Sequence, residues 1–183
     1  MRGELDSAIQ AIHVRFGEHS LQRATRLPAT SPWPSGVEAV DRLSGIGGLP
    51  LGRLSVLTGS GTCGKLSLAL GLLARASHEF ARVLILDPEG CFDGWSLAPF
   101  GAELSALTVV RPPDLAACGE AATALARAGA GFLLLLSSPG EALSVGMDLS
   151  SLEAASARSG TLVLAVVERP SQPLAYASSL TLD

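Results

Sequence analysis

The residues best suited to chemistry lie between Gly59 and Lys65, where the sequence reads GSGTCGK. This segment fits the spacing G-x-x-x-x-G-K, in which glycines let backbone N–H groups turn inward around phosphate oxygens. Lys65 supplies a compact positive charge, and it is the only lysine in a chain with twelve arginines. Because the fork of an arginine fits poorly between two phosphates, lysine here favours a phosphate-binding loop over an ordinary glycine-rich turn.

The predicted nucleotide-binding residues run through this loop into the helix that follows, and ATP is the predicted ligand. They are Gly59, Ser60, Gly61, Thr62, Cys63, Gly64, Lys65, Leu66 and Ser67. After the lysine the motif requires a serine or threonine whose hydroxyl ligates Mg²⁺, but the residue here is Leu66. Ser67 follows, yet one helical step rotates it by about 100°. No residue is therefore assigned to a metal, and a Mg²⁺ site is not predicted.

Two carboxylates, Asp87 and Glu89, follow the apolar stretch VLIL. Ligands bind at the carboxyl ends of strands in open α/β sheets, so Asp87 and Glu89 are both candidates for the two acidic roles of a P-loop ATPase, holding Mg²⁺ and activating water. Asp87 is the candidate substitute for a metal-holding acid, and a solvated loop is the alternative for both residues. The apolar stretch FLLLL ends in Ser137 and Ser138, where a P-loop ATPase presents an aspartate. With two metal-holding positions lost, we expect weak or absent ATP hydrolysis.

Apolar runs that alternate with helical patterns must position this loop and these carboxylates. The expected strands are 54–58, 83–87, 107–110, 132–137, 161–167 and 179–182, and the expected helices are 37–43, 64–76, 114–128 and 148–159. Continuous apolar strands between helices are typical of a parallel sheet that is covered on both faces. The sequence therefore predicts an α/β fold, a mostly parallel twisted sheet flanked by helices, with the loop between a strand and a helix.

The first part of the chain differs from this pattern. Apolar residues at helical spacing predict an N-terminal helix within residues 1–27, and Pro28, Pro32 and Pro34 predict an extended linker over 28–35. Residues 36–183 then form the predicted nucleotide-binding core. The apolar face of the helix must pack on its own core or on a neighbouring molecule, and we expect Trp33 to anchor the linker by packing.

Composition narrows the class of protein further. The chain is 48% hydrophobic and 16% charged with a formal net charge of −4, which argues against a broadly basic nucleic-acid-binding protein. A basic cluster is formed by Arg15, Arg23 and Arg26. We expect it to be a solvated surface rather than a contact to DNA phosphates. Direct DNA binding is therefore expected to be weak. The absence of a membrane-length apolar run and of a signal-peptide core predicts a cytoplasmic protein, with association with the nucleoid as an option.

Several segments together resemble the RecA family. They are AIQAIHVRFGEHSLQR, PSGVEAVDRLSGIGGLPLGRLSVLTG, LILDPEGCFD, GFLLLLSS and PLAYASSLTLD, which follow one another in the family's order. The resemblance implies a RecA-like P-loop NTPase core in which Glu89 corresponds to the catalytic glutamate. It also shows departures: 22 residues separate Ser138 from Thr161 and six separate Glu168 from Ala175, leaving little room for the family's DNA-binding loops. Strand exchange by this chain alone is not expected.

Shortened RecA-like proteins with these losses resemble the ImuA type. That resemblance implies an accessory protein in DNA repair, the SOS response and translesion synthesis. The implied partners are RecA or RecA-like subunits and a Y-family polymerase relative. Two alternatives stay open: an active DNA-dependent ATPase of the recombinase type, and a nucleotide-free interaction module that joins or caps RecA filaments.

Overall fold

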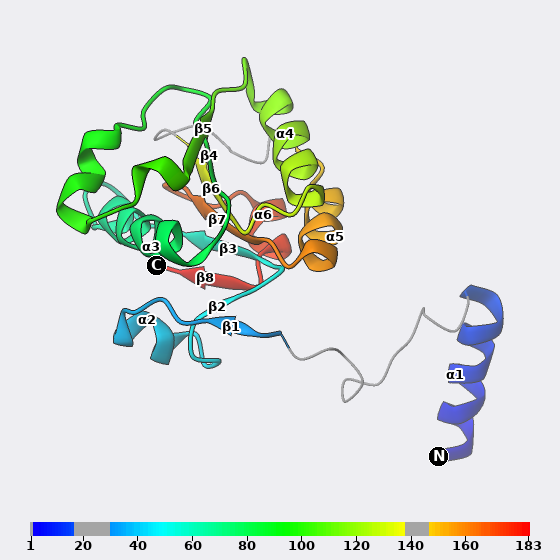
Figure 1. Cartoon of the computed structure of the whole chain (residues 1–183). Helices are drawn as coiled ribbons and strands as arrows, with labels where there is room; N and C mark the ends of the chain where they lie inside the picture. The colour runs from blue at the N-terminus through cyan, green and yellow to red at the C-terminus, as the bar shows by residue number, and fades with distance from the viewer. Residues whose placement is uncertain (1, 17–29, 138–146) are drawn as a thin grey trace. The chain divides into compact units, whose positions relative to one another are not determined.

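A computed structural model describes residues 2–16, 30–137 and 147–183 (Figure 1). The chain divides into two units, Met1–Thr30 and Ser31–Asp183. The first unit contains the predicted N-terminal helix, α1 (Arg2–Phe16). The described residues do not include two arginines of the predicted basic cluster, Arg23 and Arg26. They also do not include Pro28 of the predicted linker or Ser138. No helix in the described ranges is long and apolar enough to cross a membrane.

Within the described residues, the second unit is built on a six-stranded sheet in which every pairing is parallel. The strands are β3 (Leu54–Leu57), β4 (Val83–Leu86), β5 (Leu107–Val110), β6 (Phe132–Leu136), β7 (Leu162–Val166) and β8 (Leu180–Leu182). Their order across the sheet is β5-β4-β6-β7-β3-β8. The central strands β6 and β7 are buried throughout, which explains why their sequences are apolar without alternation. The predicted α/β fold with a parallel sheet is confirmed.

Helices cover both faces of the sheet. The helices of this unit are α2 (Glu38–Leu43), α3 (Lys65–Glu79), α4 (Leu115–Arg127), α5 (Leu149–Ser159) and α6 (Gln172–Ala177). Alternate residues of one strand enter different cores: Leu134 packs with α3 on one face, whereas Leu133 and Leu135 pack with α4 and α5 on the other. Figure 1 shows α4 and α5 side by side and α3 across the sheet from them. Because the sheet is buried on both faces, the ends of its strands are where polar side chains can reach a ligand.

Trp33 anchors the beginning of this unit, as predicted. It lies in β1 (Pro32–Trp33), which pairs antiparallel with β2 (Leu49–Pro50), and it is only 5% exposed. Its indole Nε1 donates a hydrogen bond to Glu79 Oε2 at 2.6 Å, and its ring lies 5.4 Å from Phe80 and 5.7 Å from Phe132. The second half of the proline-rich segment is therefore fastened to α3 and β6.

Some elements of the described residues were not predicted. They are the two-residue strands β1 and β2, the 3₁₀ helices η3 (Gly94–Phe100) and η4 (Leu104–Ala106), and α6. The two-residue strands and the three-residue η4 are too short to produce a hydrophobic period, and the seven residues of η3 follow a 3₁₀ rather than an α-helical spacing. Helix α6 is also short, and its start is marked by Pro173 in the first turn and by the Ser171 side chain, which accepts a hydrogen bond from the Leu174 N–H.

Candidate functional site

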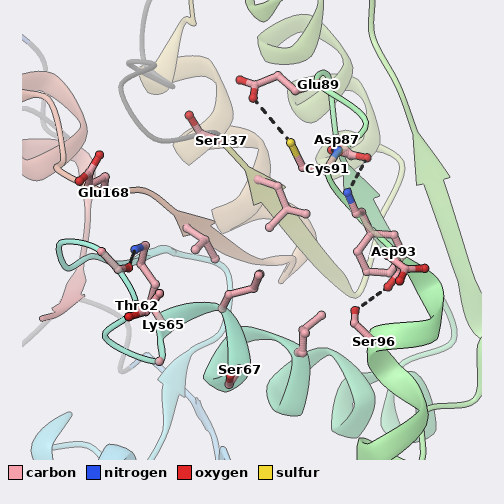
Figure 2. Close-up of a pocket in the computed structure, with 17 residues that line it drawn as sticks. Thr62, Lys65, Ser67, Asp87, Glu89, Cys91, Asp93, Ser96, Ser137 and Glu168 are labelled. Atoms are coloured by element: carbon pink, nitrogen blue, oxygen red, sulfur yellow. Dashed lines mark hydrogen bonds between the residues drawn. The ribbon is translucent and has the colours of Figure 1, made fainter.

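A cavity of about 460 Å³ lies where the N-terminus of α3 faces the carboxyl ends of β4, β6 and β7 (Figure 2). This is the edge of a parallel sheet at which ligands bind in open α/β folds. Of the predicted nucleotide-binding residues, Gly61, Thr62, Gly64, Lys65, Leu66 and Ser67 line it. Gly59, Ser60 and Cys63 belong to the same loop but are not part of the cavity wall. Asp87, Glu89 and Ser137 also line the cavity, so residues far apart in the sequence meet here.

Glycine is required at two positions of the loop. Gly59 has φ 141°, and a Cβ atom placed on it would lie 2.5 Å from Cys63 Sγ, so a larger residue would force the loop to move. Gly64 has φ 91° and is the left-handed residue immediately before α3, with no side chain capping the helix. The first N–H groups of α3 therefore lack a side-chain cap from Gly64 and lie beside the cavity, as an anion site at a helix N-terminus requires.

Lys65 brings a positive charge to the same place. Its Nζ donates a hydrogen bond to the Gly61 carbonyl at 3.0 Å, which holds the ammonium group over the loop. An ammonium group has three donors, so two are left for phosphate oxygens. Helix dipole, backbone N–H groups and ammonium group thus act on one point, which is the electrostatic arrangement that binds a phosphate.

The residue after Lys65 presents a hydrocarbon surface to the cavity. Leu66 is 51% exposed and lines the wall at the position where the motif requires a hydroxyl. Ser67 is exposed and also lines the cavity, so it neither caps α3 nor packs in the core. Figure 2 shows its side chain on α3, apart from Lys65 and Thr62. The loop offers nitrogen donors to phosphate oxygens, and Leu66 contributes no ligand for a metal.

Asp87 is used by the fold. It is 1% exposed, its Oδ1 accepts the Cys91 N–H at 2.8 Å, and its Oδ2 accepts the Phe92 N–H at 3.1 Å. The Arg111 guanidinium Nε lies 3.4 Å from Oδ2. The carboxylate therefore closes the turn after β4, and its oxygens are engaged. The solvated-loop alternative is wrong for Asp87, because its side chain is buried. That Asp87 replaces a metal-holding acid stays a prediction, and both of its oxygens already accept hydrogen bonds.

Glu89 lies on the turn that Asp87 closes. Its side chain is exposed and lines the cavity, and Cys91 Sγ lies 3.9 Å from Glu89 Oε2. Figure 2 shows Glu89 and Ser137 across the cavity from Lys65. A carboxylate at this position could accept a proton from water that attacks a phosphate held by the loop. Ser137, at the end of β6, supplies a neutral hydroxyl where a metal-holding carboxylate would be needed.

Sequence comparison identifies the family to which this site belongs. The family model of the RecA N-terminal domain matches residues 3–150. The chain belongs to the RecA family. It is 30% identical over 136 residues to protein RecA of Oceanobacillus iheyensis, 31% identical over 131 residues to protein RecA of Thermus thermophilus and 32% identical over 136 residues to protein RecA of Salinispora tropica. These matches cover 73%, 70% and 73% of this chain.

The matches cover 39%, 38% and 39% of the three RecA proteins, so the chain spans about two fifths of the length of the curated relatives it matches. The predicted membership of the RecA family is confirmed. The narrower assignment to the ImuA type stays a prediction, as do the roles of the individual site residues.

The residues present fit the phosphates of ATP but not a magnesium ion. The loop backbone and Lys65 would hold the phosphates, and ATP would bring a hydrolysable phosphoanhydride to the cavity. Mg²⁺ requires oxygen ligands in octahedral geometry. At the positions that would hold the ion, Leu66 offers no oxygen, Ser137 offers a hydroxyl in place of a carboxylate, and both Asp87 oxygens accept hydrogen bonds from the turn. Among the described residues, no three His, Cys, Asp or Glu side chains come together in a way that could hold a metal.

Eight residues of the cavity wall were not predicted as site residues: Leu70, Cys91, Phe92, Asp93, Ser96, Leu136, Val166 and Glu168. The four from Cys91 to Ser96 belong to the turn and 3₁₀ segment after β4, where Asp93 accepts the Trp95 N–H and caps η3. The backbone carbonyl of Glu168 accepts hydrogen bonds from the Thr58 hydroxyl at 3.1 Å and the Gly59 N–H at 3.3 Å. Glu168 thus ties the end of β7 to the start of the loop. Its position directly after a continuous apolar strand was the available signal.

Proposed function

We propose that this chain is a nucleotide-binding accessory member of the RecA family that acts in DNA repair or SOS-induced mutagenesis, with weak or no ATP hydrolysis. The observation that carries this proposal is the combination found at one cavity. The phosphate-binding parts are present together, in the glycine loop, the start of α3 and Lys65. The positions that would hold a metal for hydrolysis carry Leu66 and Ser137, and Asp87 is engaged elsewhere.

We propose a different role for each part of the chain. Residues 1–27 would contact a partner, 28–35 would link, and 36–183 would bind the nucleotide. Of the family's two connections that would carry DNA-binding loops, the one after β7 is short and contains the six-residue helix α6, which supports weak DNA contact and no strand exchange by this chain alone. We propose RecA or RecA-like subunits as partners and a Y-family polymerase relative as a further one, as in the ImuA type. This work would take place in the cytoplasm, and at the nucleoid when the partner is bound to DNA.

The rival with a specific observation in its favour is an active DNA-dependent ATPase, because Glu89 lines the cavity opposite Lys65. Steady-state phosphate release, measured with and without single-stranded DNA, separates the two. We expect release from the full chain no faster than from Lys65→Ala. DNA-stimulated release that Glu89→Gln abolishes would establish the rival.

A nucleotide-free interaction module is tested by thermal unfolding. We expect ADP or ATP to raise the melting temperature of the full chain and to have no effect on Lys65→Ala. Equal melting temperatures with and without nucleotide would contradict nucleotide binding and would favour the alternative of a nucleotide-free interaction module. A pull-down with the full chain as bait and purified RecA or a Y-family polymerase relative as prey tests the proposed partners directly.

A further inference from the structure

The cavity wall next to the phosphate loop is unsuited to a hydrated divalent ion. Apolar side chains from three directions line it: Leu66 and Leu70 on α3, Leu136 on β6, and Val166 on β7. Mg²⁺ gives up its water reluctantly and needs near-ideal octahedral oxygen ligands. These four side chains offer the ion no oxygen ligand. The mismatch therefore concerns the apolar part of the wall, and Leu66 is the most exposed of the four.

The charge of the cavity points the same way. Among the described residues that line it, Lys65 is the only cation. Arg111 neutralises Asp87, but three other carboxylates line the wall, those of Glu89, Asp93 and Glu168. Negative side chains therefore outnumber the single ammonium group. Like charges at a few ångströms repel strongly where water is restricted. Each further phosphate on an uncomplexed ligand adds negative charge that nothing else in the wall neutralises.

We infer that this site selects a nucleoside diphosphate that carries no magnesium ion, an inference that rests on the proposed nucleotide binding. The loop N–H groups and the start of α3 hold two phosphates, and Lys65 neutralises the terminal one. A third phosphate would extend toward Glu89 and the apolar wall. There it would meet a carboxylate and hydrocarbon, with no metal to balance its charge.

Equilibrium binding tests the inference on the full chain. ADP and ATP are titrated separately by calorimetry, each in excess EDTA and in millimolar magnesium chloride. We expect ADP to bind in EDTA and magnesium to leave its affinity unchanged or lower. In EDTA, ATP binds about tenfold or more weakly than ADP, the factor that about 1.4 kcal/mol of charge repulsion produces.

Two matched variants sharpen the test. In Leu66→Thr a hydroxyl takes the place of the apolar side chain, and we expect magnesium to tighten ADP binding in this variant. Leu104→Thr is the control, because Leu104 is 59% exposed in η4 and does not line the cavity; its binding should match wild type. Melting curves of both variants confirm that they fold. A Leu66→Thr variant as indifferent to magnesium as wild type would refute the contribution of Leu66.

Failure of the inference and failure of the proposed function give different results. If magnesium tightens ADP binding by wild type about tenfold, or if ATP binds more tightly than ADP, the inference is wrong. Nucleotide binding that Lys65→Ala abolishes would then still support the proposed function. If neither nucleotide binds in either buffer, the proposed function is wrong and the inference falls with it.

Discussion

Replacing Asp87 with asparagine separates a structural carboxylate from a metal-binding one. The side chain is 1% exposed and accepts two backbone N–H groups, those of Cys91 and Phe92. Asparagine has nearly the same size, but it carries one carbonyl oxygen and one NH₂ group. Its oxygen can still accept one N–H, whereas its NH₂ group must face the other N–H and the Arg111 guanidinium, which are both donors.

The magnitude follows from these contacts. A hydrogen bond to a charged group contributes about 1.5–3 kcal/mol, and asparagine loses one such bond and weakens the other. The ion pair with Arg111 adds little, since the Arg111 side chain is 59% exposed. We expect Asp87→Asn to lower the free energy of unfolding by about 2–4 kcal/mol. For a folded unit of this size, that corresponds to a fall of about 5–15 °C in melting temperature.

Urea unfolding followed by circular dichroism gives the free energy of unfolding of wild type and of Asp87→Asn. Glu89→Gln is the matched control, because Glu89 lies two residues away on the same turn with an exposed side chain. We expect the control to stay within about 0.5 kcal/mol of wild type. A change in Asp87→Asn as small as that of the control would refute the reasoning, because it would mean that the carboxylate does not hold the turn.

Three further predictions concern other parts of the molecule. Trp33→Phe keeps the ring contacts but loses the hydrogen bond to Glu79, so urea unfolding should show a loss of about 1–2 kcal/mol; no loss would contradict the anchoring contact. Burial raises the pKa of the Cys118 thiol to about 11, so a thiol reagent at pH 8 should modify the two exposed cysteines quickly and Cys118 only after denaturant is added. Hydrogen bonds, first that from Ser150, lower the pKa of Asp148 from 3.8 to about 2, so its contribution to stability is complete above pH 3.8 and is lost as the pH falls toward 2. Asp148→Asn should weaken that acid dependence in unfolding curves, and an unchanged dependence would contradict the assignment.

The sequence was sufficient to predict the order of the principal strands and helices of the sheet. Strands such as β6 are buried on both faces and therefore carry continuous apolar runs, which alternate with longer helical patterns. What it could not predict was α6, with six residues, and η3, whose irregular run of residues has no helical period. Both are set by capping side chains and by packing against neighbours that only the folded chain supplies.

Part of the candidate site could likewise be predicted from the sequence, and part of it could not. The loop could be predicted because its glycines and Lys65 are needed at fixed positions of one short segment, so their spacing in the sequence is itself the signal. The part of the wall formed by Asp93 and Ser96 could not, because it depends on how the turn and η3 fold after β4. The burial of Asp87 could not be predicted for a related reason: a carboxylate at a strand end looks solvated in sequence, and only the folded turn brings the N–H groups that it accepts.

The central claim is that a phosphate site survives around Lys65. The most direct measurement is calorimetric titration of ADP into wild type and into Lys65→Arg, a variant that keeps the charge but replaces the point-like ammonium group with a planar fork. We predict saturable binding to wild type and a loss of about tenfold or more in Lys65→Arg. No binding to wild type, or equal binding to both proteins, would contradict the claim.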